Sequence, residues 1–430
     1  MKQNASRSNT ERSHFSILWM LLLIGLVLCF AVKSEAIPAF ARQLNTKCHT
    51  CHFPNPPRLN NVGIVFKRMG YRLPDADDNG NLIFKTPEIH DALEFASVVA
   101  NVELEVDKNS PSPEQSKSTL SLGEVELFGA HALGPRLSYL TMFELRNEEG
   151  EAELEVADVQ YNLGNATDAF HLRGGRIQTL WWQKTDHEGL TLSMAPTIDE
   201  MGPAMIGSFA GFGLGQKQIA AEFGYTHNRL KEGSMTSTIL SAMILNGVDV
   251  SGEQTARRSG TGFDFLAQGY QLFGSSNTAG GFYYHGNTRF GIDEGGPPME
   301  RPGLQAQEGQ EIHKDTFDRY GFVGNYLIGG HADVLAGFVA GKDKSTELNM
   351  TIKNQGWFIE TDFSLAMEWS LSYRHDDLDP DTDSPGDRIK ADTVSTRYHA
   401  MDYLLLTLEF NSVRAEEKDY SVIAQVKFIY

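Results

Sequence analysis

From about residue 95 to the end of the chain, apolar and polar residues alternate in one segment after another. In the first of these segments Val102, Leu104 and Val106 alternate with Glu103 and Glu105. A period of two is typical of β-strands with one apolar and one polar face. The pattern therefore predicts a mainly β domain of antiparallel strands.

We expect about sixteen strands, an even number that would bring both ends of a closed sheet to the same side. The spacing of about 21 residues per strand and connection accommodates the ~9–11 residues of a membrane-spanning strand plus its loop. The expected strands cover residues 95–107, 119–133, 137–149, 151–165, 169–182, 218–227, 236–247, 262–273, 279–291, 316–329, 331–344, 353–367, 369–378, 389–400, 403–414 and 420–430.

Two architectures produce such strands: a soluble β-sandwich and an outer-membrane β-barrel. The apolar faces are rich in aromatic residues, as the interface girdles of barrels are. Short turns alternate with long polar connections, which matches the short periplasmic and long external loops of barrels. The short turns lie at residues 133–136, 328–331 and 367–369, and the long connections at about 183–216, 249–261, 292–315 and 379–388.

The last strand also favours the barrel, because it is amphipathic and ends on an aromatic residue. One of its faces carries Tyr420, Val422, Ala424, Val426, Phe428 and Tyr430. We therefore predict an outer-membrane, porin-like β-barrel of about sixteen antiparallel strands over residues 94–430, surrounded by outer-membrane lipid.

The preceding segment, residues 37–93, has a different texture. Two short helices are expected at about 39–52 and 58–70, separated by a proline-rich turn. Fewer than 60 residues can build only a small core. Within the first expected helix stands the run Cys48-His49-Thr50-Cys51-His52.

A Cys-x-x-Cys-His run is typical of covalent c-type haem attachment. Two thiols three residues apart can each bond one vinyl group of a porphyrin, and the next imidazole can then ligate the iron. We therefore predict one covalent haem c, held by Cys48 and Cys51, with His52 as an axial ligand. The alternatives are a redox Cys-x-x-Cys, which lacks its usual βαβ context, and a zinc site, which needs two more ligands.

The sixth iron ligand is left open by the sequence. Met69 lies in the same segment and would raise the haem potential, whereas His90 would lower it. Met69 could equally be a core residue, and an open site or a ligand from the barrel wall are further alternatives.

The N-terminal residues 1–36 have the pattern of a secretory signal peptide. A polar start with Lys2, Arg7 and Arg12 precedes the apolar run 15–32, and small residues precede Ile37. An uncleaved anchor helix is the alternative. Export agrees with covalent haem attachment, which takes place outside the cytoplasm.

The charge distribution separates the two domains. The formal net charge is −19, and removal of the net +2 of the signal segment leaves −21, so a nucleic-acid partner is not expected. Residues 37–74 nevertheless lack any acidic side chain. We expect basic residues near the haem to neutralise its propionates or to meet acidic residues of the barrel lumen. The alternative is a solvated basic face. The basic candidates are Arg42, Arg58, Lys67 and Arg68, and the acidic lumen candidates are Glu103, Glu105, Glu124 and Glu126.

The haem segment resembles that of the fused monohaem cytochrome–porins of the bacterial outer membrane. The resemblance rests on residues 38–43, the Cys48–His52 run, residues 57–60 and residues 66–71. It implies a haem plug in a barrel that takes an electron from extracellular iron(II) and passes it to a periplasmic cytochrome or similar carrier. The rivals are a conduit that carries electrons outward and a haem-plugged diffusion porin without oxidase activity.

Overall fold

The fold is seen in a computed structural model. It describes residues 39–44, 46–53, 58–76, 82–85, 96–110, 117–146, 152–180, 191–193, 195–196, 214, 217–231, 234–247, 262–293, 310–345, 349–384, 386–401, 403–415 and 418–429. The predicted signal peptide, His90 and Tyr430 lie outside these residues.

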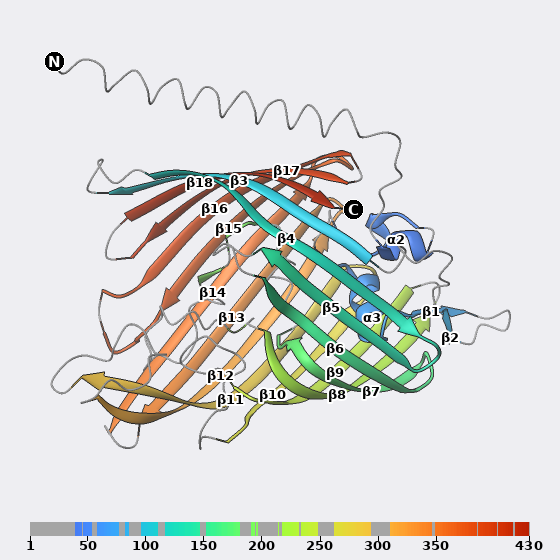
Figure 1. The fold of residues 1–430 in the computed structure, drawn as a ribbon, viewed down its shortest axis with the longest axis horizontal. Coiled ribbons are helices and arrows are strands. Elements are labelled where there is room, and N and C mark those ends of the chain that lie inside the picture. Colours follow the sequence, from blue (N-terminus) through green and yellow to red (C-terminus); the bar gives the residue numbers. More distant parts are fainter. Residues whose placement is uncertain are drawn as a thin grey trace, which may run out of the picture. The chain divides into compact units, whose positions relative to one another are not determined.

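Sixteen strands within the described residues form a closed antiparallel barrel (Figure 1). Neighbours in sequence are neighbours in the ring, and β18 pairs with β3 to close it. The strands are β3 (Ala96–Ser110), β4 (Lys117–Leu133), β5 (Leu137–Arg146), β6 (Glu153–Gly164), β7 (Asp168–Gln178), β8 (Lys217–Lys231), β9 (Ser234–Leu245), β10 (Asp264–Phe273), β11 (Asn277–Asp293), β12 (Gln310–Ile328), β13 (Ala332–Ser345), β14 (Met350–Ser364), β15 (Trp369–Asp379), β16 (Ile389–Met401), β17 (Leu404–Arg414) and β18 (Lys418–Ile429).

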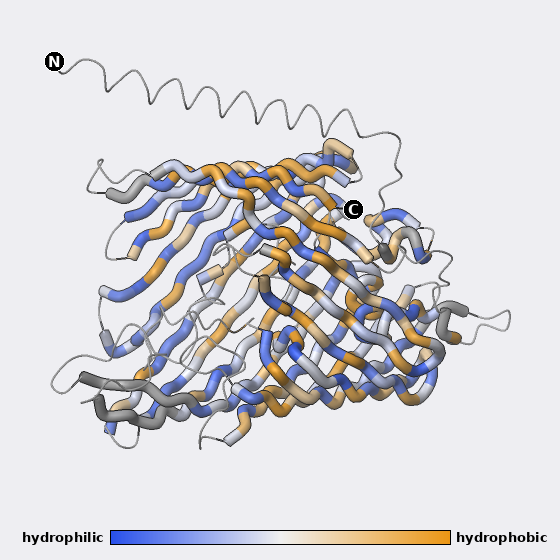
Figure 2. The backbone as a smooth tube through the Cα atoms, in the orientation of Figure 1, coloured by the Kyte–Doolittle hydropathy of each residue, from blue (hydrophilic) through white to orange (hydrophobic). Residues whose placement is uncertain are grey.

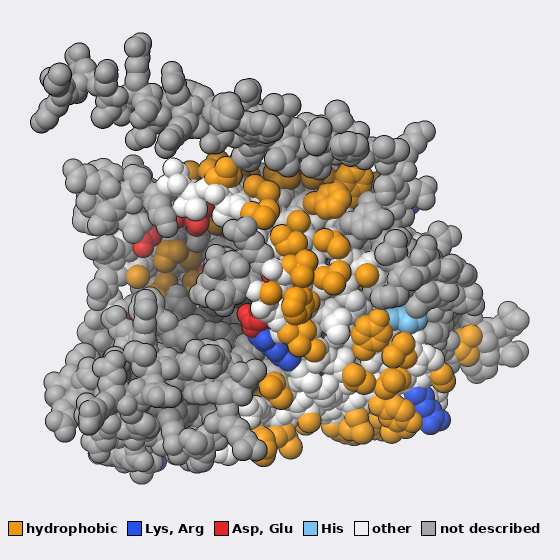
Figure 3. Space-filling view, viewed as in Figure 1, with side chains coloured by type: hydrophobic (Ala, Val, Ile, Leu, Met, Phe, Trp, Pro, Cys, Tyr) orange, Lys and Arg blue, Asp and Glu red, His pale blue; other side chains and the backbone are white. Residues whose placement is uncertain are grey.

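The outer surface of the barrel is apolar, and the lumen wall is polar over much of its area. Hydropathy alternates along the strands (Figure 2), and apolar side chains gather in patches over the described strands on the face seen in Figure 3. Leu104, Val106 and Leu127 are exposed, whereas the neighbouring Glu126 is buried on the lumen side. A closed sheet with this outer surface satisfies all its backbone groups internally, as a membrane-spanning barrel must. The sandwich alternative is therefore wrong.

Short turns gather at one end of the barrel, where the connections β4–β5, β10–β11 and β12–β13 contain only three residues each between the strands. The first residues of β3 pair with the last of β18 at this same end, because Val99 is opposite Ile429. In outer-membrane barrels the short turns face the periplasm. Both ends of the barrel sequence are thus on the periplasmic side.

The N-terminal segment contains helix α2 (Ala39–Leu44), the 3₁₀ turn η1 (Cys48–Thr50), helix α3 (Asn61–Arg68) and a hairpin of β1 (Leu73–Ala76) and β2 (Leu82–Lys85). The predicted continuous helix over 39–52 is wrong, because Lys47 is extended with ψ 156° and separates α2 from η1. The second predicted helix is confirmed but shorter, since Asn60 caps it at its N-terminus. No helix among the described residues has the length and apolarity to cross a membrane.

Helix α3 is packed inside the ring of strands, because two of its faces both meet the wall. Val65 and Met69 belong to an apolar cluster with wall residues such as Ile239 and Tyr284. Phe66, on another face, joins a second cluster with residues of β4–β6. A short helix buried on several sides in this way is fixed by its surroundings more than by its own propensity.

Candidate haem site

The Cys48–His52 run forms a tight turn. The backbone nitrogens of Cys51 and His52 donate to the Cys48 carbonyl oxygen at 3.1 and 3.0 Å. Neither cysteine is part of a disulfide. Burial, and then the nearby Cys48, raise the pKa of Cys51 to about 11, so this sulfur is a thiol at neutral pH.

The ring of His52 is held in one tautomer. Its Nδ1 lies 3.2 Å from the carbonyl oxygen of Arg58. A carbonyl can only accept a hydrogen bond, so Nδ1 carries a proton, and in the neutral imidazole the lone pair is then on Nε2. Metal-bound histidines are typically oriented by this kind of bond from the second ring nitrogen. The two thiols and the imidazole therefore fit a c-type haem.

Asn60 joins the Cys48–His52 turn, which we call the haem turn after its candidate cofactor, to helix α3. Its Nδ2 donates to the carbonyl oxygens of His49, Thr50 and His52 at 3.4, 3.1 and 3.4 Å. Its Oδ1 accepts the backbone N–H of Gly63 at 3.1 Å, which caps the helix. One side chain thus fixes the turn and begins the helix.

Gly63 allows the turn and the helix to touch. A Cβ atom at this position would lie 2.3 Å from the carbonyl oxygen of Cys51. The obstacle is backbone, which cannot move aside as a flexible side chain can. Only glycine therefore fits at this contact.

Three arginines of the N-terminal segment anchor it to the barrel wall, and the first of these anchors is Arg58. Its guanidinium pairs with Asp333 on β13 and with Asp362 on β14, and all three side chains are buried. Removing one partner of such a buried pair leaves an uncompensated charge, which is costly.

The second anchor is Arg68, at the end of α3. Its Nη1 lies 3.3 Å from Oε1 of Glu222 on β8. His171 and Arg173 of β7 contact the same carboxylate at 3.3 and 3.5 Å. The backbone oxygen of Arg68 also accepts from Gln160 of β6 at 2.9 Å, so this anchor involves three neighbouring strands.

The third anchor, Arg72, binds main-chain oxygens. It donates to the carbonyl oxygens of Gly134 and Leu137, on either side of the β4–β5 turn, at 2.5 and 2.8 Å. Burial lowers the pKa of this guanidinium. The side chain of Asn61 also binds main-chain oxygens, at the β10–β11 turn. Its Nδ2 donates to the carbonyl oxygens of Gly274 and Asn277 at 3.0 and 2.9 Å. The contacts lie around the ring at its short-turn end.

These contacts decide between the expectations for the basic residues. A solvated basic face is wrong for Arg58 and Arg68, which are buried. The acids that they contact include wall residues that sequence reasoning missed, namely Asp333, Asp362 and Glu222. Nothing in the sequence marks these three among the many inward acids of the strands.

The remaining candidates have the following positions. Lys67 Nζ donates to Oε1 of Gln178 at 3.4 Å, and the side chain of Arg42 lies outside the described part of the chain. Met69 is fully buried in the apolar cluster, where its Sδ is 3.9 Å from Nδ2 of Asn228. Its role as an iron ligand stays a prediction.

The acidic lumen candidates belong to the wall of β3 and β4. Glu103 accepts from Nε2 of Gln425 at 2.6 Å. Glu124 and Glu126 interact electrostatically with Glu144 of β5, which is also buried. Glu105, between the outward Leu104 and Val106, shares the inward face. The role of these side chains in the lumen stays a prediction.

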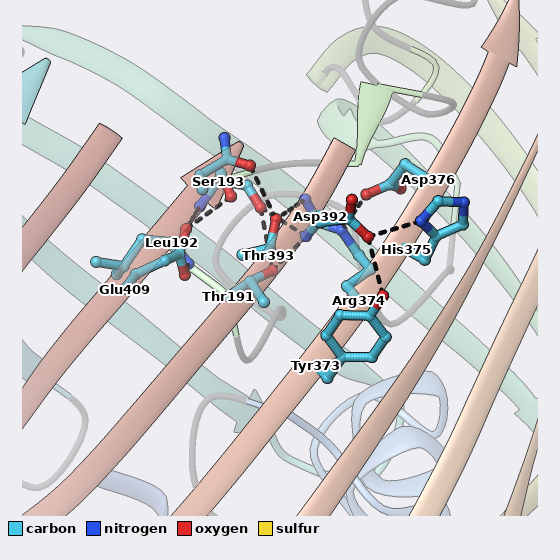
Figure 4. Close-up of polar contacts among 11 residues, drawn as sticks. Thr191, Leu192, Ser193, Tyr373, Arg374, His375, Asp376, Asp392, Thr393 and Glu409 are labelled. Atoms are coloured by element: carbon cyan, nitrogen blue, oxygen red, sulfur yellow. Dashed lines mark hydrogen bonds and ion pairs between the residues drawn. The ribbon is translucent and has the colours of Figure 1, made fainter. Parts of the chain in front are cut away.

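A second segment, Thr191–Ser193, is also held against the wall (Figure 4). Oxygens of Glu409 accept from the backbone nitrogens of Leu192 and Ser193 at 2.5 and 2.8 Å. Arg374 donates to the hydroxyl of Thr191 and, at 2.7 Å, to the carbonyl oxygen of Ser193. We call this contact the lumen clamp.

The lumen clamp crosses the barrel. Its segment belongs to the connection between β7 and β8, whereas Arg374 and Glu409 are on β15 and β17. β7 and β15 are eight positions apart in the sixteen-strand ring. The segment therefore reaches the wall opposite the strand from which it departs, which sequence reasoning did not predict.

Comparison with solved structures finds the same barrel architecture in bacterial outer-membrane proteins. An anion-selective porin from Comamonas acidovorans matches with a TM-score of 0.51 at 12% identity, over 78% of this chain and 99% of the porin. OmpT, an outer membrane protein of Vibrio cholerae, in its trimer form, matches with 0.50 at 9% identity, over 78% and 99% of the two chains. The sequence matches no protein-family model and no curated protein.

The fold thus defines the class: the chain is a sixteen-stranded, porin-like β-barrel of the bacterial outer membrane, whose apolar surface contacts lipid. Within this class, the buried anchors distinguish it as a barrel whose N-terminal segment occupies the short-turn mouth.

Proposed function

We propose that the chain is an outer-membrane cytochrome–porin that transfers one electron at a time from an external donor to a periplasmic carrier, with iron(II) as the donor. Iron(II) is oxidised to iron(III), and the carrier gains the electron. A covalently held haem would supply the one-electron redox centre between them.

The observation that carries this proposal is the hydrogen bond from His52 Nδ1 to the Arg58 carbonyl, within a turn whose two cysteines form no disulfide. A redox Cys-x-x-Cys gives no reason for a histidine held in this tautomer beside the second cysteine. A zinc site needs further ligands, and the described residues contain no group of three or more His, Cys, Asp or Glu side chains that could hold a metal ion. Three polar anchors of the same segment at the barrel mouth support a role within the membrane-crossing structure.

The residues of the chain contribute three things to the transfer. Cys48, Cys51 and His52 would hold the redox centre. Arg58, Arg68 and Arg72 would keep it from leaving the barrel mouth. The acidic wall around Glu126 and Glu144 would attract a cation such as iron(II) into the lumen.

The test is stopped-flow mixing of the purified ferric protein with iron(II), followed by haem absorbance and repeated with His52→Ala. We expect rapid reduction of the wild type and a loss of at least tenfold in rate in the variant. No absorbance change in the wild type would refute the iron proposal.

The same preparation separates the two rivals. A strongly negative haem potential would favour an outward conduit. The likeness to porins favours a haem-plugged diffusion porin as the second candidate. Large ion conductance in planar bilayers together with no reduction by iron(II) would identify that candidate.

A further inference from the structure

Arg58 connects the haem turn to the barrel through two different groups. Its carbonyl oxygen accepts from His52 Nδ1 at 3.2 Å and from the backbone nitrogen of Phe53 at 3.1 Å. Its guanidinium pairs with Asp333 and Asp362. The atom that orients the imidazole therefore belongs to a residue whose side chain is fixed by the wall.

The wall side of this contact is built for a cation. Asp333 and Asp362 are directly opposite each other on β13 and β14, and both are buried. Like charges in this cross-strand relation repel each other unless a cation lies between them. Asn325 holds Asp333 from the other side, with Nδ2 2.8 Å from Oδ1. The planar guanidinium of Arg58 supplies this cation and so stabilises the two opposed carboxylates.

We propose that Asp333 and Asp362 are positioning residues for the proximal histidine, and that through Arg58 the barrel wall tunes the haem potential. The proposal rests on the proposed function, because it needs a haem on His52. A hydrogen bond from Nδ1 makes the imidazole a more basic ligand, which favours ferric iron. A loosened Arg58 carbonyl should weaken that bond and raise the potential.

The decisive variants change the anchor in two ways. Arg58→Lys keeps the positive charge but cannot bridge two carboxylates as a planar fork does. The double variant Asp333→Asn, Asp362→Asn removes the carboxylates and leaves the fork. If the double variant does not fold, Arg58→Lys decides alone.

The matched control is Asp343→Asn. Asp343 is buried on the same strand, β13, and pairs with Arg319 at 2.8 Å. It lies ten residues from Asp333, or about 33 Å along a strand. It therefore reports any general effect of losing a buried carboxylate from this wall.

Two properties of the full-length haem protein in detergent are measured. The first is the hydrogen-exchange rate of His52 Nδ1–H in the ferrous state by NMR. The second is the reduced-to-oxidised ratio at a fixed applied potential. In both anchor variants we expect at least tenfold faster exchange and a ratio about tenfold higher, equivalent to about 59 mV for one electron.

The outcomes separate this proposal from the proposed function. Anchor variants that match the wild type in both properties would overturn the positioning role while leaving electron transfer intact. A control that shifts as far as the anchor variants would overturn it too. A wild type without covalent haem in a pyridine haemochrome assay would overturn the proposed function itself.

Discussion

Two segments are held against the inner wall of the barrel, and they differ in which partner supplies the charged side chains. The N-terminal segment contacts acids of the wall through its own charged side chains, Arg58 and Arg68. At the lumen clamp the charged side chains belong to the wall, because Arg374 and Glu409 bind mainly backbone groups of Thr191–Ser193.

The difference shows which of the two kinds of contact can be recognised from the sequence of the docked segment. A segment that docks by its side chains carries the docking charges itself, which explains why residues 37–74 are basic in an acidic chain. A segment that docks mainly by its backbone, here with two hydroxyl contacts from Thr191 and Ser193, needs no charged residues of its own. Its partners are then ordinary inward positions of strands.

The largest expected effect comes from Arg58→Ala, which leaves Asp333 and Asp362 buried, opposed and without their cation. Loss of one partner of a buried ion pair costs about 3–5 kcal/mol. We expect the opening free energy of α3, measured by native-state hydrogen exchange of its amides, to fall by this amount.

The control for this variant is Arg388→Ala. Arg388 pairs with Asp377 at 2.5 Å but is about half exposed. Asp377 is itself buried, but it keeps a second cation, Lys390 at 3.6 Å, so the loss should be small and α3 should exchange as in the wild type. Equal losses in the two variants would mean that burial of the Arg58 anchor is not what stabilises the segment.

The barrel could be predicted from the sequence because its signal is local. Each strand alternates along its own length, so all sixteen predicted strands are confirmed in type and order. Their ends are less certain where strands extend beyond the bilayer. β12, for example, begins at Gln310 and not at 316, since backbone pairing with β11 continues through polar residues.

The candidate site could be predicted only in part. The Cys48–His52 spacing predicts the haem site because the whole motif is contained in five consecutive residues. The partners of Arg58 lie 275 and 304 residues away, and only closure of the ring decides that β13 and β14 face it. The break before Cys48 was missed because helix periodicity does not register a single extended residue such as Lys47.

A smaller effect is expected at the lumen clamp. Glu409→Gln keeps the shape of the side chain but replaces one accepting oxygen by an amide. Hydrogen bonds to a charged group contribute about 1.5–3 kcal/mol, so the amides of Leu192 and Ser193 should exchange faster by a corresponding factor. Ion conductance in planar bilayers should rise as well.

The same variant sharpens the comparison, because the two docked segments contact different residues of the wall. Thr191–Ser193 contacts Arg374 and Glu409, whereas Arg58 and Arg68 contact Asp333, Asp362 and Glu222. Distant sites without shared partners behave additively. We therefore expect the α3 amides of Glu409→Gln to exchange as in the wild type. Faster exchange in α3 would show that the two segments are one cooperative unit.

The smallest effect is expected at Asn60, where two roles can be separated. Asn60→Ser keeps an oxygen that can cap α3 but loses the amide that binds three carbonyls of the haem turn. Asn60→Ala loses both, and loss of the cap costs about 1 kcal/mol. The Ser variant should therefore accelerate exchange at the backbone amides of Cys51 and His52 while α3 stays protected, and the Ala variant should accelerate both. If the Ser variant leaves the turn unchanged, the turn is held by Arg58 and the barrel wall, and Asn60 serves only the helix.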